Sequence, residues 1–196
     1  MAKGAHYRVS YRRRMEHKTD YKARRTLATS EAPRFVVRVS NRSLIVQLVR
    51  SEIAGDFVAT QATSKELAEK YNWRASSSSI PAAYLVGLIA GHRAVKEGLG
   101  NANLDLGLRR PTKGSKVFAA VKGAIDAGLK VPCDSDVMPP PERIGGGDIA
   151  KYAEMIGDPF EYERLFSVYL KRGLRPETLP THFEETKSKI MEEWAK

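Results

Sequence analysis

Four aspartates in this sequence could together form a catalytic site. Carboxylates around paired metal ions are what a two-metal nuclease needs to cleave a phosphodiester bond. Asp105 lies in a predicted strand, a suitable place for a metal ligand, whereas Asp126 lies near the exposed end of a predicted helix. Asp134 and Asp136 lie in a predicted loop. A metal-dependent nuclease that uses Asp105 is therefore an alternative, although spacing alone does not bring the four carboxylates together.

Other catalytic chemistry has weaker support in the sequence. The four histidines lie far apart and lack metal-ligand spacing with any Cys or Glu; they are His6, His17, His92 and His182. The three glycines at 145–147 lack a preceding strand and a following Gly-Lys-Ser/Thr, so they indicate a flexible hinge and not a phosphate loop. We therefore expect no catalytic residue, no metal, no cofactor and no small-molecule substrate.

The net charge of +10 lies entirely in the first quarter of the chain. Residues 1–50 hold 13 Lys/Arg and 3 Asp/Glu, whereas residues 51–196 hold 20 of each sign. A localised basic excess favours a nucleic acid, an anionic membrane or an acidic protein as partner. Residues 3–25 contain too few apolar side chains for a membrane-surface helix. The charge distribution therefore predicts a nucleic-acid partner and no membrane interaction.

The first 25 residues interleave cations with tyrosines, a mixture suited to a nucleic acid. Lys and Arg replace counterions on phosphates, and an arm of this kind can be ordered by the nucleic acid that it binds. Tyrosines could stack on unpaired bases or ribose, or could instead pack against the protein's own sheet. Each single charge could also be only a solvated surface residue. The predicted nucleic-acid contacts here are Tyr7, Arg8, Tyr11, Arg12, Arg13, Arg14, Lys18, Tyr21, Lys22, Arg24 and Arg25.

A second basic motif, LRRPTKGSKVF, spans residues 108–118. It joins a strand end, a rigid turn at Pro111 and a helix N-terminus at Ser115, where free N–H groups and the helix dipole favour a phosphate. A basic loop of no functional importance is the alternative interpretation. The predicted nucleic-acid contacts in this motif and at the preceding hairpin turn are Arg38, Asn41, Arg42, Arg109, Arg110, Lys113, Ser115 and Lys116.

Hydrophobic periodicity predicts the elements that position these side chains. Alternating runs indicate strands, and runs with helical spacing that follow capping residues indicate helices. Their order predicts an α/β fold with a mixed sheet and packed helices. The helix at 81–98 is apolar and rich in small residues, which indicates that it is buried against the sheet. The predicted strands are 34–40, 43–50, 56–63 and 103–110, and the predicted helices are 20–32, 63–71, 81–98 and 115–128.

Composition predicts three regions, namely a basic arm at 1–30, an α/β core at 31–140, and a linker followed by a helical extension at 141–196. The stretch DSDVMPPPERIGGG marks the linker, and two or three amphipathic helices follow. Their apolar stripes are Tyr162, Leu165, Phe166, Tyr169 and Leu170, then Phe183, Ile190, Met191 and Trp194. The single cysteine, Cys133, excludes an internal disulfide, and no run is apolar and long enough to cross a membrane. We expect a cytosolic protein.

Four blocks of this chain, in the same order, resemble one protein family. The blocks are YRVSYRRRMEHKTDYKARR, PRFVVRVSNRSLIVQLV, IPAAYLVGLIAGHRA and LDLGLRRPTKGSKVFAAVKGAIDAGLKVP, and with their neighbours they cover most of residues 7–145. The family is that of large-subunit ribosomal protein eighteen, the universal 5S-rRNA-binding protein, in its archaeal/eukaryotic branch. The segment ERIGGGDIAKYAEMI is similar to the C-terminal extension of archaeal members.

The resemblance implies a structural, non-catalytic role on the cytoplasmic ribosome. It implies binding of 5S rRNA and its attachment to 23S rRNA in the central protuberance, beside large-subunit ribosomal protein five and other proteins of that region. It also implies a ribonuclease H-like α/β/α core, but a shared fold does not imply a shared activity. A metal-dependent nuclease of that fold and a nonspecific nucleic-acid-binding protein are the alternatives.

Overall fold

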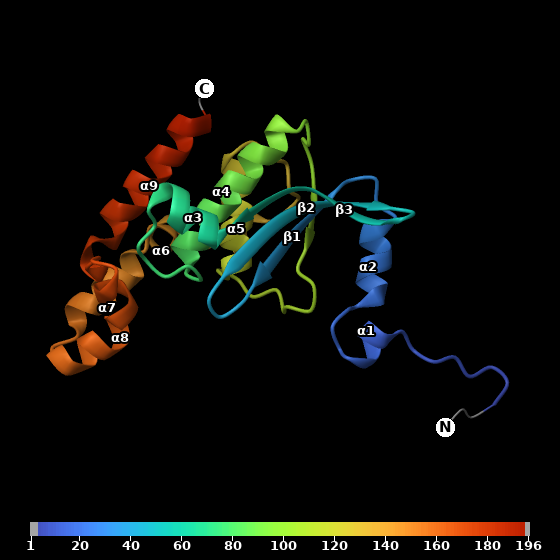
Figure 1. The fold of residues 1–196 in the computed structure, drawn as a ribbon, viewed down its shortest axis with the longest axis horizontal. Helices are drawn as coiled ribbons and strands as arrows, with labels where there is room; N and C mark the ends of the chain where they lie inside the picture. Colours follow the sequence, from blue (N-terminus) through green and yellow to red (C-terminus); the bar gives the residue numbers. More distant parts are fainter. Residues whose placement is uncertain (1–3, 195–196) are drawn as a thin grey trace.

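A four-stranded mixed sheet forms the centre of the protein in a computed structural model that describes residues 4–194 (Figure 1). The strands are β1 (Arg34–Val39), β2 (Leu44–Glu52), β3 (Gly55–Thr63) and β4 (Asn103–Asp105). Their spatial order is β3-β2-β1-β4, with antiparallel pairing except between the parallel strands β1 and β4. The predicted mixed α/β sheet is confirmed.

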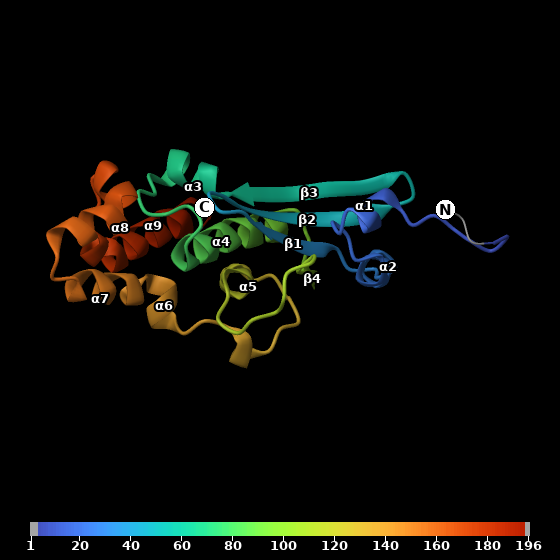
Figure 2. The same cartoon turned by 90° about the horizontal axis from the view of Figure 1, so that it is seen from below.

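Burial alternates along the first half of β2, as the sequence pattern predicts, whereas the first four residues of β1 are all buried. Phe35 and Val37 of β1, and Leu44, Val46 and Leu48 of β2, are fully buried in the main core. They face helices α4 (Ile80–Lys96) and α5 (Lys116–Asp126), which lie on the same side of the sheet (Figure 2). Arg34, Val36 and Arg38 alternate with these residues along β1 and lie on the opposite side of the sheet, which therefore carries the two arginines discussed below.

Strand β4 is shorter than the 103–110 segment predicted from its alternating leucines. It ends at Asp105, whose carboxylate accepts a hydrogen bond from the Gly107 N–H at 2.8 Å. Such a local side-chain turn competes with strand pairing. Gly107 has a φ of +63°, and beyond it Leu108 is exposed. The extended prediction was wrong because the aspartate turn redirects the chain.

Local capping signals position most of the helices. Asp20 caps α2 (Tyr21–Ala28) by accepting the N–H groups of Lys22 and Ala23, and Thr63 caps α3 (Ser64–Tyr71) by accepting the Glu66 N–H. These two predicted starts are confirmed. Ser115 stands at the N-cap of α5 as predicted, but within the described residues its hydroxyl makes no capping hydrogen bond.

Glycines let α4 and α5 cross in backbone contact. A Cβ on Gly87 would lie 2.0 Å from the carbonyl oxygen of Ala120, and one on Gly123 would lie 2.1 Å from that of Tyr84. The burial predicted for α4 is confirmed, but its small residues face α5 and not only the sheet. The close crossing fixes the N-terminus of α5 relative to the rest of the core.

We expect Gly123→Ala to lower the free energy of unfolding by about 1–3 kcal/mol, the usual cost of forcing an extra methyl group into a packed core. Helix propensity alone would favour alanine by about 1 kcal/mol, so destabilisation would show that packing decides the result. Urea unfolding measures the change. Gly145→Ala is the control, because open space surrounds that helical position. Equal stability of the two variants would contradict the close crossing.

The C-terminal region consists of α6 (Pro141–Gly145), α7 (Gly147–Met155), α8 (Pro159–Lys171) and α9 (Leu179–Trp194), with short 3-10 turns at Ser135–Val137 and Pro176–Thr178. The predicted linker is therefore wrong over its second half. Helices α6 and α7 meet at Gly146, with a φ of +85°, where a Cβ would lie 2.7 Å from the Leu179 side chain.

The C-terminal helices share the hydrophobic core of the sheet domain. Leu179, Phe183 and Ile190 are buried in the same cluster as the strands, and α9 contacts α3, α4, α6 and α7. In the predicted stripe of α8, Phe166 and Tyr169 are buried but Leu165 is exposed. None of the helices within residues 4–194 combines the length and apolarity needed to span a bilayer.

Candidate nucleic-acid interface

The basic arm folds partly against itself. Before α2, the described part of the arm (residues 4–20) contains one short turn of helix, α1 (Arg12–Met15). The rings of Tyr11 and Tyr21 lie 4.8 Å apart, and the Arg13 Nε donates a hydrogen bond to the Thr19 hydroxyl at 2.8 Å. Tyr7 and Tyr11 are 53% and 69% exposed, so their rings remain accessible.

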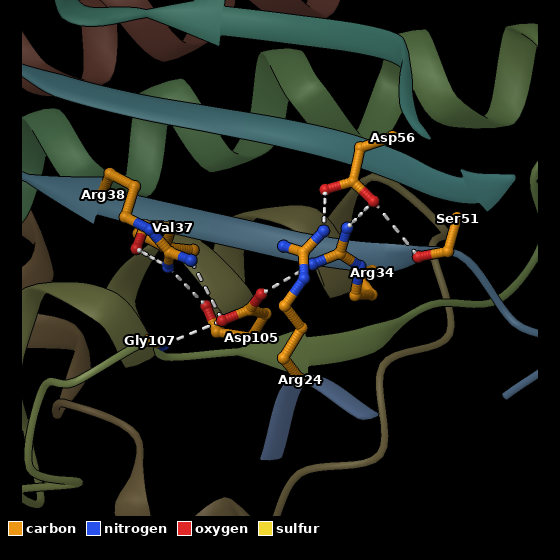
Figure 3. Close-up of polar contacts among 8 residues, drawn as sticks. All are labelled: Arg24, Arg34, Val37, Arg38, Ser51, Asp56, Asp105 and Gly107. Carbon is orange, nitrogen blue, oxygen red and sulfur yellow. Dashed lines mark hydrogen bonds and ion pairs between the residues drawn. The ribbon is translucent and has the colours of Figure 1, made fainter. Parts of the chain in front are cut away.

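Helix α2 is attached to the sheet by alternating charges that we call the charge ladder (Figure 3). Arg24 of α2 pairs with Asp56 of β3 at 2.8 Å, and Asp56 pairs with Arg34 of β1 at 2.8 Å. Arg34 pairs with Asp105 of β4 at 3.3 Å, and Asp105 pairs with Arg38 of β1 at 3.0 Å. The ladder therefore connects the arm to three of the four strands.

The centre of the ladder is charged and buried, whereas its two ends, Arg24 and Arg38, are partly exposed. Arg34 is 4% exposed and Asp105 is 7% exposed. Burial acts to raise the pKa of Asp56, but hydrogen bonds and charges from Arg24 and Arg34 outweigh it, so this pKa lies below its ordinary value. Buried ion pairs of this kind fix geometry, and removing one partner is costly. The ladder therefore holds Arg24 and Arg38 in defined positions.

Two of the four candidate carboxylates of a nuclease, Asp105 and Asp126, are engaged in structural contacts. Asp105 lies between two arginines, Arg34 and Arg38, and pairs with both. Asp126 pairs with Lys122 at 2.8 Å and accepts a hydrogen bond from the Tyr84 hydroxyl at 2.9 Å. Within residues 4–194, no three His, Cys, Asp or Glu side chains gather in a way that could hold a metal ion.

A groove of about 730 Å³, here called the arm groove, lies between the arm and the sheet. It is lined by residues from the arm, from β1 and from the turn that follows β4. Residues far apart in the sequence therefore meet at one site. The predicted RNA contacts that line the arm groove are Arg13, Lys18, Arg24, Arg38 and Arg109.

A second groove of about 670 Å³, here called the loop groove, lies beside the N-terminus of α5. Arg109 and Val39 line both grooves, so the two hollows adjoin. The predicted contacts that line the loop groove are Asn41, Arg109, Arg110, Ser115 and Lys116. Arg143 of α6 also lines it and was missed, because it lies in a stretch that the composition marks as a linker.

The remaining predicted contacts are exposed or half-buried in the described chain but line neither of these two grooves. Tyr21 packs against Tyr11. The cations of this set lie on the arm, at the first hairpin turn and in the loop before α5. Whether they touch RNA stays a prediction. They are Tyr7, Arg8, Tyr11, Arg12, Arg14, Tyr21, Lys22, Arg25, Arg42 and Lys113.

Comparison with known proteins identifies a family. The family model described as "Ribosomal large subunit proteins 60S L5, and 50S L18" matches residues 5–101 and 96–134. The large ribosomal subunit protein uL18 of Caldivirga maquilingensis is 50% identical to this chain, over 100% of this chain and 96% of the relative.

Two further archaeal relatives match over nearly the whole chain. The uL18 protein of Ignicoccus hospitalis is 50% identical over 99% of this chain and 96% of its own length. The uL18 protein of Saccharolobus solfataricus is 46% identical over 97% of this chain and 96% of its own length. The chain therefore belongs to the archaeal uL18 family of ribosomal proteins, and it is a structural, non-enzymatic component of the large subunit of the cytoplasmic ribosome.

Proposed function

We propose that this protein binds 5S rRNA and attaches it to 23S rRNA in the central protuberance, beside large-subunit ribosomal protein five and other proteins of that region. The observation that carries the proposal is the convergence of arm, sheet and loop cations on the arm groove. Cations that approach from several directions can contact successive phosphates of a folded strand. Because the chain belongs to a ribosomal protein family, rRNA is the nucleic acid that we expect this surface to bind.

The charge ladder gives this surface a fixed orientation before RNA arrives. Asp105 accepts one bond from Arg38 through its carboxylate and a second through its backbone carbonyl, both at 3.0 Å. The guanidinium carries five N–H donors, so further donors of Arg38 remain for a phosphate. The 46% exposure of the Arg38 side chain leaves that group accessible to RNA. Binding then requires less ordering of this side chain.

The arm supplies the remaining contacts. Its cations neutralise phosphates on one side of the RNA, and the exposed rings of Tyr7 and Tyr11 stack on unpaired bases or pack against ribose. The cations of the loop groove extend the same surface toward α5. An interface of this shape selects a folded RNA because the two grooves and the arm face different segments of the strand.

We expect the purified chain to bind 5S rRNA more tightly than tRNA at the same salt concentration, because the arm and grooves fit one folded shape. A gel-shift titration of labelled 5S rRNA with unlabelled tRNA and duplex DNA as competitors measures this. Competition by tRNA as strong as that by unlabelled 5S rRNA would contradict the proposal. Equal competition by duplex DNA would favour the nonspecific binder instead.

A further inference from the structure

We propose that helix α6 of the C-terminal region completes the rRNA interface, and that Arg143 holds a backbone phosphate in the loop groove together with Arg109 and Lys116. This inference rests on the proposed function. The proposed ligand is a phosphodiester group of rRNA, because several cations line the same groove and a phosphate is an anion. The family model ends at residue 134, so Arg143 lies beyond the matched segment.

The Arg143 side chain lies near the loop that precedes α5. A Cβ built on Gly114 would lie 3.6 Å from the Arg143 Nη1, and Gly114 has a φ of +68°. The Arg143 guanidinium therefore lies close to the loop of the basic motif, although nearly thirty residues of sequence separate Gly114 from Arg143. Arg110 lines the same groove from the start of that loop.

Two of the three other cations that line the loop groove, Arg109 and Lys116, are held in place by neighbouring polar groups. Arg109 donates a hydrogen bond to the backbone carbonyl of Val39 at the end of β1. The Lys116 ammonium donates to the Ser78 hydroxyl at 3.4 Å, and that hydroxyl donates to the Ser40 carbonyl at 2.8 Å. Groups that are already positioned lose less entropy when a ligand binds.

The pocket has a positive charge that its own side chains do not balance. The described residues that line it include no Asp or Glu, and within residues 4–194 neither Arg109, Arg110 nor Lys116 forms an ion pair. Burial and the charge of Arg109 lower the pKa of Lys116. Arg143 reaches Asp148 only at 3.6 Å, in an exposed pair that contributes little. A phosphate would relieve this repulsion and bind several donors at once.

Helix α6 holds Arg143 rigidly enough for such a role. Ile144, the next residue, is buried in the common core, and α6 contacts α4 and α9. Gly146 packs against Leu179 and Pro81, which fixes the end of the helix. The C-terminal helices thus do more than extend the core, because they carry a basic side chain to the RNA-binding side.

The test compares Arg143→Gln with Arg164→Gln in the full chain. Arg164 is an exposed α8 residue with a comparable surface ion pair, to Glu161 at 3.8 Å, and it lines neither groove. Each protein is titrated separately with purified 5S rRNA and with purified 23S rRNA, and thermal unfolding checks that both variants are folded. We expect Arg143→Gln to weaken binding to at least one of these RNAs about tenfold, the effect of losing one hydrogen bond to a charged group.

The salt dependence separates a phosphate contact from a structural effect. Loss of one phosphate contact makes the slope of log affinity against log salt shallower by about 0.7–0.9. If the unmodified chain binds but Arg143→Gln and Arg164→Gln have the same affinity for both RNAs, this inference alone is overturned. Failure of the unmodified chain to bind either RNA would overturn the proposed function itself.

Discussion

A chain that begins at Thr19 will bind 5S rRNA on the order of a thousandfold more weakly than the full chain. The deletion removes six Lys/Arg and one Asp/Glu from the arm. Of the predicted contacts it removes five cations, which at roughly 1 kcal/mol for each phosphate contact amount to about 5 kcal/mol, and 1.4 kcal/mol is tenfold in affinity. Filter binding at one fixed salt concentration measures the loss.

This truncation tests the arm contacts more specifically than one that also removes α2. The Asp20 cap and the Arg24–Asp56 pair remain, so the rest of the interface keeps its shape. A matched control replaces Lys65 and Lys70 by Gln, because these cations lie on α3, away from both grooves. The control should bind within about threefold of the unmodified chain. Undiminished binding by the truncated chain would show that the arm does not contact the RNA.

Asp105→Ala will lower the free energy of unfolding by about 3–5 kcal/mol, because it leaves the buried Arg34 with one partner fewer and frees Arg38. Asp56 still pairs with Arg34, so we expect the lower part of this range. Urea unfolding followed by circular dichroism measures the change. The variant also tests the alternative role of Asp105, since a metal ligand could be removed from a nuclease site without such a loss of stability.

Asp136→Ala is the control for this experiment. Asp136 is exposed and lies in the short turn at Ser135–Val137, so its removal should change stability by less than about 0.5 kcal/mol. Asp105→Asn should fall between the two, because the amide oxygen still accepts hydrogen bonds but carries no charge. Asp105→Ala and Asp136→Ala with equal stability would contradict the account of the charge ladder.

The features that the sequence predicts well depend on neighbours in the chain. Burial alternates along the first half of β2 because successive side chains of a strand point to opposite faces. Asp20 and Thr63 start helices because each accepts backbone N–H groups two or three residues ahead. The family resemblance also required no structure, since it depends on the order of long sequence blocks.

The features that the sequence did not predict depend on distant contacts. Strand β4 ends at Asp105, and the partners of this residue, Arg34 and Arg38, lie 71 and 67 positions earlier. Helix α6 forms within a proline- and glycine-rich stretch because Ile144 and Gly146 pack on the core. No periodicity encodes such contacts.

The candidate site shows the same division. Its basic residue types could be recognised from composition and charge, because Lys and Arg concentrate in the arm and in the loop before α5. Their arrangement around two adjoining grooves could not, since it depends on the charge ladder and on the crossing of α4 and α5. Arg143 joins the loop groove only through the packing of α6.

The salt dependence of 5S rRNA binding, measured in parallel for the full chain and for the chain that begins at Thr19, tests the central claim most directly. If about eight phosphates are neutralised, log affinity against log salt has a slope of about −5 to −7 for the full chain. Loss of five arm contacts makes the slope of the truncated chain shallower by about 3.5–4.5. Equal slopes for the two chains would contradict the claim that the arm binds RNA through its phosphates.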